Sequence, residues 1–168
     1  MKLFVLLARL VLGGLFVGHG TQKLLGWFGG HGLDGTAGFF ESLGMRPGRQ
    51  HAIIAGTAET GGGALLALGL ATPAAAAAIT GVMTTAIRTV HAPNGPWVTD
   101  GGWEYPAVII ATAALITAVG PGPVSLDAAR GGEMSGTGWT LAALAAGAGM
   151  STVLLRDWER PAPPPPSA

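Results

Sequence analysis

Five apolar segments run along the chain, separated by connections rich in glycine and proline. They lie at about residues 3–25, 51–71, 73–91, 105–119 and 139–156. A helix that crosses a bilayer needs about 20 residues at a rise of about 1.5 Å each, and the first segment exceeds that length. The pattern predicts an all-α fold, an integral membrane helix bundle. Four helices form a core domain in residues 1–127, and the last segment adds a fifth C-terminal transmembrane helix.

The connections have patterns of their own. In the glycine-rich stretch 26–50, apolar or small side chains recur at helical spacing from Thr36 to Leu43, which favours a short amphipathic helix on the membrane face. A plain loop explains so short a pattern equally well. Residues 128–138 read as a polar loop. The proline-rich residues 157–168 are expected to be a disordered tail, because they have almost nothing to bury.

Composition supports a membrane location. Hydrophobic residues make up 49% of the chain and charged residues 11%, whereas soluble domains carry about 25% charged residues. The lipid bilayer is therefore the expected partner. A net charge of zero argues against nucleic-acid binding. The absence of cysteine excludes dithiol and iron–sulfur chemistry within the chain, and we expect no metal.

The first segment carries charged residues along one helical face. Arg9, Gly13, Phe16, Gly20 and Lys23 follow at steps of 4, 3, 4 and 3, so a helix places them in one narrow stripe. A charge at mid-membrane costs roughly 3 kcal/mol on insertion scales, so such residues usually face a protein interior or a wet cavity. This helix therefore needs partners that supply counter-charges.

Consecutive helices run in opposite directions, which allows the depth of each polar residue to be estimated. Six polar groups converge on the half of the bundle where the first helix ends, while Arg9 points towards the other half. The six are His19, Lys23, Glu59, Arg88, His91 and Glu104. Most aromatic residues, Trp103 among them, fall in the loops of the same half. The sequence predicts a polar cavity that opens to one face and is roofed by these loops.

Each of these residues also has a simpler interpretation. Lys23, His51, His91 and Glu104 could be side chains that reach to the interface from a helix end. Arg9 and Glu59 are too central for that and could form a structural ion pair. His19 with His91 could hold a haem, but four histidines scattered over the chain are a poor signal, and haem is not expected.

The same residues carry a family resemblance. The pattern R-x-x-x-G-x-x-F-x-x-x-G-x-x-K from Arg9 to Lys23 resembles the opening of DoxX family membrane proteins. AETGGGALLALGL, which contains Glu59, is similar to their second-helix motif, and Glu104 with GPGPVSLD at 120–127 is similar to their closing motif. The resemblance covers about residues 3–127, so residues 128–168 inherit nothing from it. It implies a four-helix core in a multi-pass protein of the bacterial plasma membrane. It also implies a relation to the small subunit of a thiosulfate:quinone oxidoreductase.

Two functions follow as hypotheses. In the first, suggested by the resemblance, the chain is a subunit of a quinone-linked membrane oxidoreductase. The catalytic residues are then Glu59 as proton relay with Arg9 and Lys23 as electrostatic stabilisers. The quinone-binding residues are His19, Arg88, His91, Glu104 and Trp103.

The first hypothesis needs an electron-donating partner protein, because the chain has no evident electron carrier. In the second, the same cavity belongs to a non-catalytic scaffold or a carrier of a small molecule or lipid. Whether the chain forms a homo-oligomer is left open.

Overall fold

In the computed structural model, residues 2–132, 134–158 and 160–161 are described, and every regular element in them is a helix. The α-helices are α1 (Lys2–Leu25), α2 (Gly32–Ser42), α3 (Gly48–Leu68), α4 (Thr72–Ala86), α5 (Glu104–Val119), α6 (Leu126–Ala129) and α7 (Thr137–Leu154). The all-α prediction is confirmed, and a helix lies in each of the five apolar segments. Most of the expected proline-rich tail, residues 159 and 162–168, lies outside the described residues.

Two connections differ from a simple reading of the sequence. The stretch 26–50 contains α2, so the short-helix alternative is right and the plain loop is wrong. The expected polar loop 128–138 is shorter in the structure, because α6 extends to Ala129 and α7 begins at Thr137. Ser125 caps α6 by accepting a hydrogen bond from the Ala128 N–H. Among the described helices, one, α1, is long and apolar enough to cross a membrane, and α5 is a shorter apolar helix.

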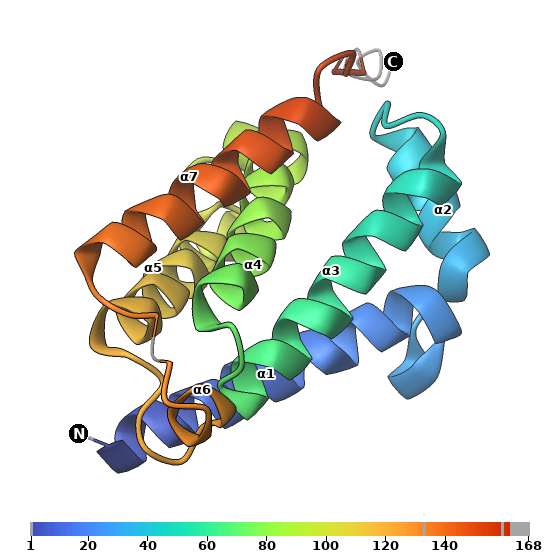
Figure 1. Ribbon diagram of the computed structural model, residues 1–168. Coiled ribbons are helices and arrows are strands. Elements are labelled where there is room, and N and C mark those ends of the chain that lie inside the picture. The colour runs from blue at the N-terminus through green and yellow to red at the C-terminus, as the bar shows by residue number, and fades with distance from the viewer. Residues whose placement is uncertain (1, 133, 159, 162–168) are drawn as a thin grey trace, which may run out of the picture.

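The helices form two groups (Figure 1). α1, α2 and α3 make one group, in which α1 packs along α3, and α4, α5 and α7 make the other, in which α7 packs along α4. The groups are joined by the short turn between α3 and α4 and diverge towards the end that holds α2 and the last turn of α7.

Glycine sets the distance between α1 and α3. A Cβ atom placed on Gly63 would lie 2.6 Å from the carbonyl oxygen of Gly13 and 2.8 Å from the Cβ of Phe16. Gly20 likewise faces the backbone of α3 with no space for a side chain. Small residues allow membrane helices to approach closely. The glycines of the α1 stripe are therefore explained by the close contact between α1 and α3.

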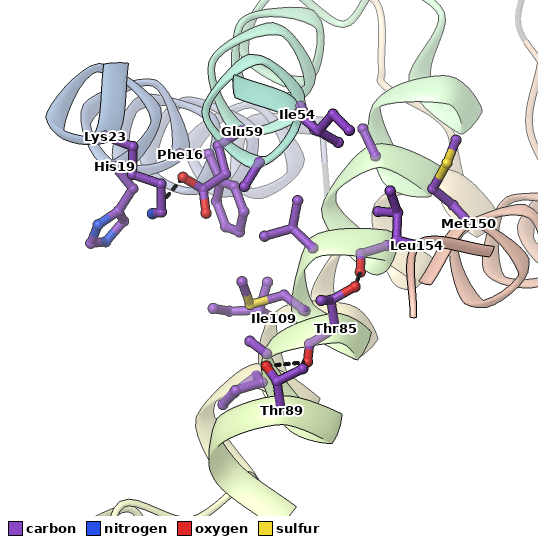
Figure 2. A pocket seen from close by; sticks show the side chains of 18 of the residues that line it. Phe16, His19, Lys23, Ile54, Glu59, Thr85, Thr89, Ile109, Met150 and Leu154 are labelled. Atoms are coloured by element: carbon purple, nitrogen blue, oxygen red, sulfur yellow. Dashed lines mark hydrogen bonds and ion pairs between the residues drawn. The ribbon is translucent and has the colours of Figure 1, made fainter. Parts of the chain in front are cut away.

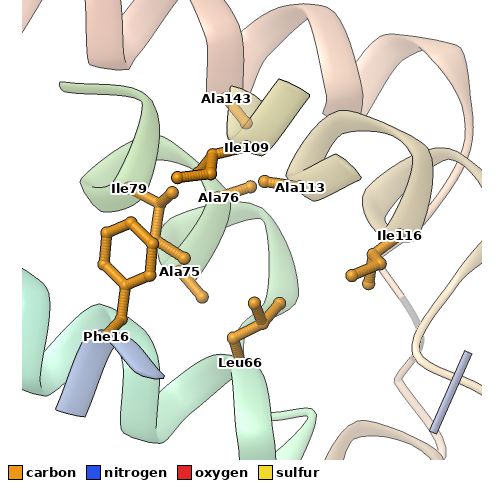
Figure 3. Close-up of a cluster of buried hydrophobic side chains, with 9 residues drawn as sticks. All are labelled: Phe16, Leu66, Ala75, Ala76, Ile79, Ile109, Ala113, Ile116 and Ala143. Carbon is orange, nitrogen blue, oxygen red and sulfur yellow. The ribbon is translucent and has the colours of Figure 1, made fainter. Parts of the chain in front are cut away.

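A core of small side chains joins the two groups (Figure 3). Phe16 from α1 and Leu66 from α3 contact alanines and isoleucines of α4 and α5, with one alanine from α7. The buried cluster comprises Phe16, Leu66, Ala75, Ala76, Ile79, Ile109, Ala113, Ile116 and Ala143. Because four of the nine are alanine, the helices here lie close together rather than being held apart by long side chains.

Arg9 fastens the end of the molecule opposite α2. Its side chain is 1% exposed, and its guanidinium donates hydrogen bonds to the carbonyl oxygens of Leu66 (3.0 Å), Ala67 (2.8 Å), Val124 (3.0 Å) and Pro121. The last carbonyls of a helix have no partner within it, so Arg9 satisfies two of those at the end of α3. It thereby ties α1 to α3 and to the 120–124 loop.

Asp127 completes this junction. Its carboxylate accepts hydrogen bonds from the N–H of Ala71 (2.8 Å) and from the N–H (3.1 Å) and hydroxyl (3.0 Å) of Thr72, where α4 begins. A carboxylate at a helix start satisfies unpaired N–H groups and complements the helix dipole. The GPGPVSLD motif therefore stabilises the turn between α3 and α4 by hydrogen bonds to its Asp127.

The segment after α7 bridges the two helix groups at the other end. The indole Nε1–H of Trp158 donates to the carbonyl oxygen of Leu43 (2.7 Å), and Arg160 donates to the carbonyl oxygen of Arg88 (2.9 Å). The expectation of disorder from residue 157 onward is therefore wrong for Trp158 and Arg160. A partly buried indole N–H usually needs a hydrogen-bond partner. The bonds to Leu43 and Arg88 hold this segment against the residues that follow α2 and α4.

A Trp158→Phe substitution tests this bridge. It keeps an aromatic ring but removes the donor to Leu43, so we expect the segment to open about fivefold more often, as the loss of one hydrogen bond of about 1 kcal/mol implies. Trypsin cleavage after Arg156 should accelerate by a similar factor. Trp139→Phe, at an exposed tryptophan of α7, serves as the matched control and should leave the cleavage rate unchanged.

Candidate functional site

A pocket of about 720 Å³ lies between the two helix groups. Figure 2 shows its labelled lining: Phe16 from α1, Ile54 from α3, Ile109 from α5, and Met150 and Leu154 from α7. Alanines of α4 complete the wall. The lining is mainly apolar, so the expected polar cavity is wrong in character. Ligand sites are typically apolar hollows of this size with a few placed polar groups.

The principal polar feature of the pocket is an ion pair. Lys23 Nζ of α1 lies 2.7 Å from Glu59 Oε2 of α3, with the Glu59 side chain 4% exposed and that of Lys23 27% exposed. Within the described part of the chain, Glu59 Oε1 accepts no hydrogen bond, and other protein atoms do not cover it completely. It therefore remains accessible from the pocket as an acceptor.

The ion pair follows from the packing of α1 on α3. Lys23 is three residues after Gly20, whose missing side chain lets α1 approach α3 at Gly56 and Thr60. The expected alternative of an Arg9–Glu59 pair is wrong, because Glu59 pairs with Lys23 and Arg9 binds backbone carbonyls. Arg9 and Lys23 share a face but are 14 residues apart, about 21 Å along the helix, so one carboxylate cannot serve both.

Two predicted histidines also line the pocket. His19 lies at its exposed edge, beside Lys23 (Figure 2), with Nδ1 3.1 Å from Gln22 Oε1. His91 has its Nδ1 2.7 Å from the carbonyl oxygen of Gly101 and so holds the loop that follows α4. His19, Lys23, Glu59 and His91 are thus the predicted site residues that the structure brings together.

The other predicted site residues lie elsewhere. Arg88 donates to the hydroxyls of Ser151 and Thr152 on α7 at 3.4 and 3.3 Å, and Glu104 accepts from the N–H of Val98 at 2.8 Å. Trp103 is exposed at the start of α5, and Arg9 lies in the structural junction. Placing Arg88 and Glu104 in one cavity with Glu59 is therefore wrong, and neither Trp103 nor Arg9 lines the pocket.

The displacement of Arg88 has a local cause. The end of α4 widens into a π-helical turn, Ile87–His91, which changes the direction in which side chains leave the helix. Thr85 and Thr89, just before and within this turn, line the pocket instead and donate their hydroxyls to the carbonyls of Gly81 (2.8 Å) and Thr85 (2.9 Å). A regular helical wheel gives no sign of this exchange.

The contribution of α7 was also missed. Met150 and Leu154 line the pocket because Gly147 lets α7 lie directly on α4: a Cβ on Gly147 would be 2.7 Å from the carbonyl oxygen of Ala77. The glycine in an alanine-rich segment is the one available signal, and it is weak in a chain with 29 glycines.

These features define an all-helical protein with a helix of membrane-spanning length and a mainly apolar pocket lined in part by a partly buried ion pair. The family model described as DoxX matches residues 4–92, more than half of the chain. The chain therefore belongs to the DoxX family and is a DoxX-like membrane protein. Comparison with curated proteins and with solved structures gives no significant match.

Proposed function

We propose that this protein is a quinone-binding subunit of a membrane oxidoreductase complex and spans the bacterial plasma membrane several times. The observation that carries the proposal is the Lys23–Glu59 pair in the wall of a mainly apolar pocket. Such a site suits a molecule with an apolar body and a polar head. A relation to the small subunit of a thiosulfate:quinone oxidoreductase, implied by the motifs, belongs to this proposal.

A multi-pass arrangement is supported by the exposed apolar side chains. α1, α5 and α7 each carry large apolar residues on their outer faces, among them Leu3, Phe4, Val11, Val108, Leu115, Leu141 and Val153. Water would disfavour such surfaces, whereas lipid suits them. In this proposal α1, α3, α4 with its π-helical turn, α5 and α7 cross the bilayer.

The lining fits a quinone. Phe16 and Ile109 offer apolar contacts to a flat ring, and Ile54, Met150 and Leu154 continue the apolar wall towards α7 for a tail. Lys23 offers the ammonium donor that a ring carbonyl requires, while its charge is balanced by Glu59. A lone ammonium at this depth would be costly, so the pair is a reasonable way to place a donor there.

The chemistry that a quinone supplies is the uptake of two electrons with two protons. Glu59 can hold a proton at Oε1 and exchange it with a bound head group, since that oxygen is open to the pocket. Lys23 orients the head group and stabilises negative charge near it. The chain has no cysteine, so we assign electron delivery to a partner protein.

A second candidate function, a non-catalytic carrier of a lipid or another lipophilic molecule, is favoured by the lining itself. Lys23 is already neutralised by Glu59, and the remaining wall is mostly apolar. An acyl chain would therefore fit as well as a quinone tail. The two functions differ in whether the loss of the Glu59 carboxylate changes ligand binding and activity.

A Glu59→Gln substitution separates them. In mild detergent, we expect the purified protein to bind a decyl-chain benzoquinone, and the variant to bind it at least about tenfold more weakly, because Lys23 loses the partner that positions it. Quinone-dependent activity in native membranes should fall with it, while membrane insertion is retained. Binding is followed by the thermal shift of the protein and by identifying any quinone that co-purifies.

Asp100→Asn, an exposed change of the same chemical type, is the matched control and should behave as the original chain. Unchanged quinone binding and activity in Glu59→Gln would end the redox proposal. Co-purified lipid together with no quinone response in either protein would instead favour the carrier.

A further inference from the structure

The imidazole of His19 is oriented by the side chain of Gln22. Gln22 donates through Nε2 to the carbonyl oxygen of Phe28 at 3.3 Å, and its Oε1 lies 3.1 Å from His19 Nδ1. One amide thus joins the loop after α1 to the edge of the pocket. Gln22 lines neither wall of the pocket, so its contribution acts through His19.

The chemistry of these groups fixes where the hydrogens are. A backbone carbonyl only accepts, so the NH₂ of Gln22 must face Phe28 and its oxygen must face His19. That oxygen also only accepts, so His19 Nδ1 carries the hydrogen. In a neutral imidazole the other nitrogen, Nε2, is then the acceptor.

The loop that supplies the Phe28 carbonyl is shaped around Gln22. A Cβ on Gly30 would lie 2.6 Å from the Cα and Cβ of Gln22, so the loop returns directly onto this side chain. Phe28 itself has φ 52°, a left-handed conformation that is unfavourable for a bulky residue. The backbone therefore accepts strain at the residue whose carbonyl holds the amide.

The pocket edge now has a definite pattern of hydrogen-bonding groups. His19 Nε2 has no hydrogen-bond partner among residues 2–132, 134–158 and 160–161, and Glu59 Oε1 is likewise free there. Both are acceptors, and Lys23 beside them is the donor. A head group with hydrogen-bond acceptors alone leaves both of these protein acceptors unused.

We propose that the pocket selects lipophilic molecules whose head group carries a hydroxyl, and that Gln22 is the positioning residue that sets this preference by holding His19 in the Nδ1–H tautomer. The inference rests on the proposed function, in which the pocket binds a quinone. It adds that the reduced hydroquinone, with two O–H donors, is bound more tightly than the quinone, which has none.

The test combines a ligand-free and a ligand-bound measurement. In protein labelled with ¹⁵N-histidine in detergent, the nitrogen shifts of His19, assigned by their loss in His19→Phe, should report a hydrogen on Nδ1. Gln22→Met should abolish that preference. The decyl-chain hydroquinone should bind about fivefold more tightly than its quinone, the effect of one hydrogen bond, and Gln22→Met should remove the difference.

Gln50→Met, at an exposed glutamine of α3, is the matched control and should change neither the tautomer nor the preference. A His19 that carries its hydrogen on Nε2, or equal binding of the two forms by the original chain, would overturn this inference and leave quinone binding intact. If neither form binds, the proposed function fails, and the head-group preference fails with it.

Discussion

An Arg9→Met variant is expected to lose about 3–5 kcal/mol of folding free energy, because several buried carbonyl oxygens lose their charged donor and each acceptor left unsatisfied costs about 1–3 kcal/mol. The substitution removes hydrogen bonds to four backbone carbonyls at the end of α3 and in the 120–124 loop. Methionine fills most of the volume, so the loss measures the hydrogen bonds rather than a cavity. Thermal unfolding in detergent provides the measurement.

Two further variants make the Arg9 result specific. Arg130→Met removes an exposed arginine and should leave the unfolding temperature unchanged. Arg9→Lys should recover little, because one ammonium cannot reach the carbonyls that a planar guanidinium serves together. A stable Arg9→Met variant that merely loses quinone binding would show that Arg9 acts at the pocket, contrary to its position in the structure.

A Gly63→Leu variant is expected to lose more than about 4 kcal/mol, a loss of the size caused by severe overpacking. Even a Cβ at this position would lie 2.6 Å from the backbone of α1, so the two helices would have to separate. The separation would also pull Lys23 away from Glu59. We therefore expect reduced stability and loss of ligand binding together.

Gly61→Leu is the matched control on the same helix. A Cβ on Gly61 meets nothing within 4 Å, and leucine has the higher helix propensity, so this variant should be as stable as the original chain or slightly more so. Equal destabilisation of both variants would mean that glycine is needed for the flexibility of α3 rather than for its contact with α1.

The first helix shows how far the sequence alone can lead. The stripe of Arg9, Gly13, Phe16, Gly20 and Lys23 was predicted to face the protein. The first four are buried, and Lys23 is partly exposed. The partner of Arg9 could not be predicted, because backbone carbonyls are present at every residue and leave no sequence signal. A charged residue suggested a counter-charge, and the actual partners are uncharged.

The site was predictable where the helices keep a regular α-helical period, and not where that period changes. His19, Lys23 and Glu59 follow from helical periodicity and antiparallel packing. Arg88 was misplaced because its depth along the helix does not say which neighbour it faces. Its guanidinium lies against Ser151 of α7, and the π-helical turn at Ile87–His91 in which it lies is not visible in the sequence. The apolar wall from α7 carries no chemical signature, so only the packing of the chain reveals it.

The two ends of the molecule are fastened unequally. At one end Arg9 and Asp127 connect α1, α3, α4 and the 120–127 loop through a dense set of hydrogen bonds, whereas at the other the indole of Trp158 reaches a single carbonyl. Because one end has few connections, we expect the two helix groups to separate more readily there than at the end that holds Arg9. Met45 and His51, which line the pocket, lie near the less connected end.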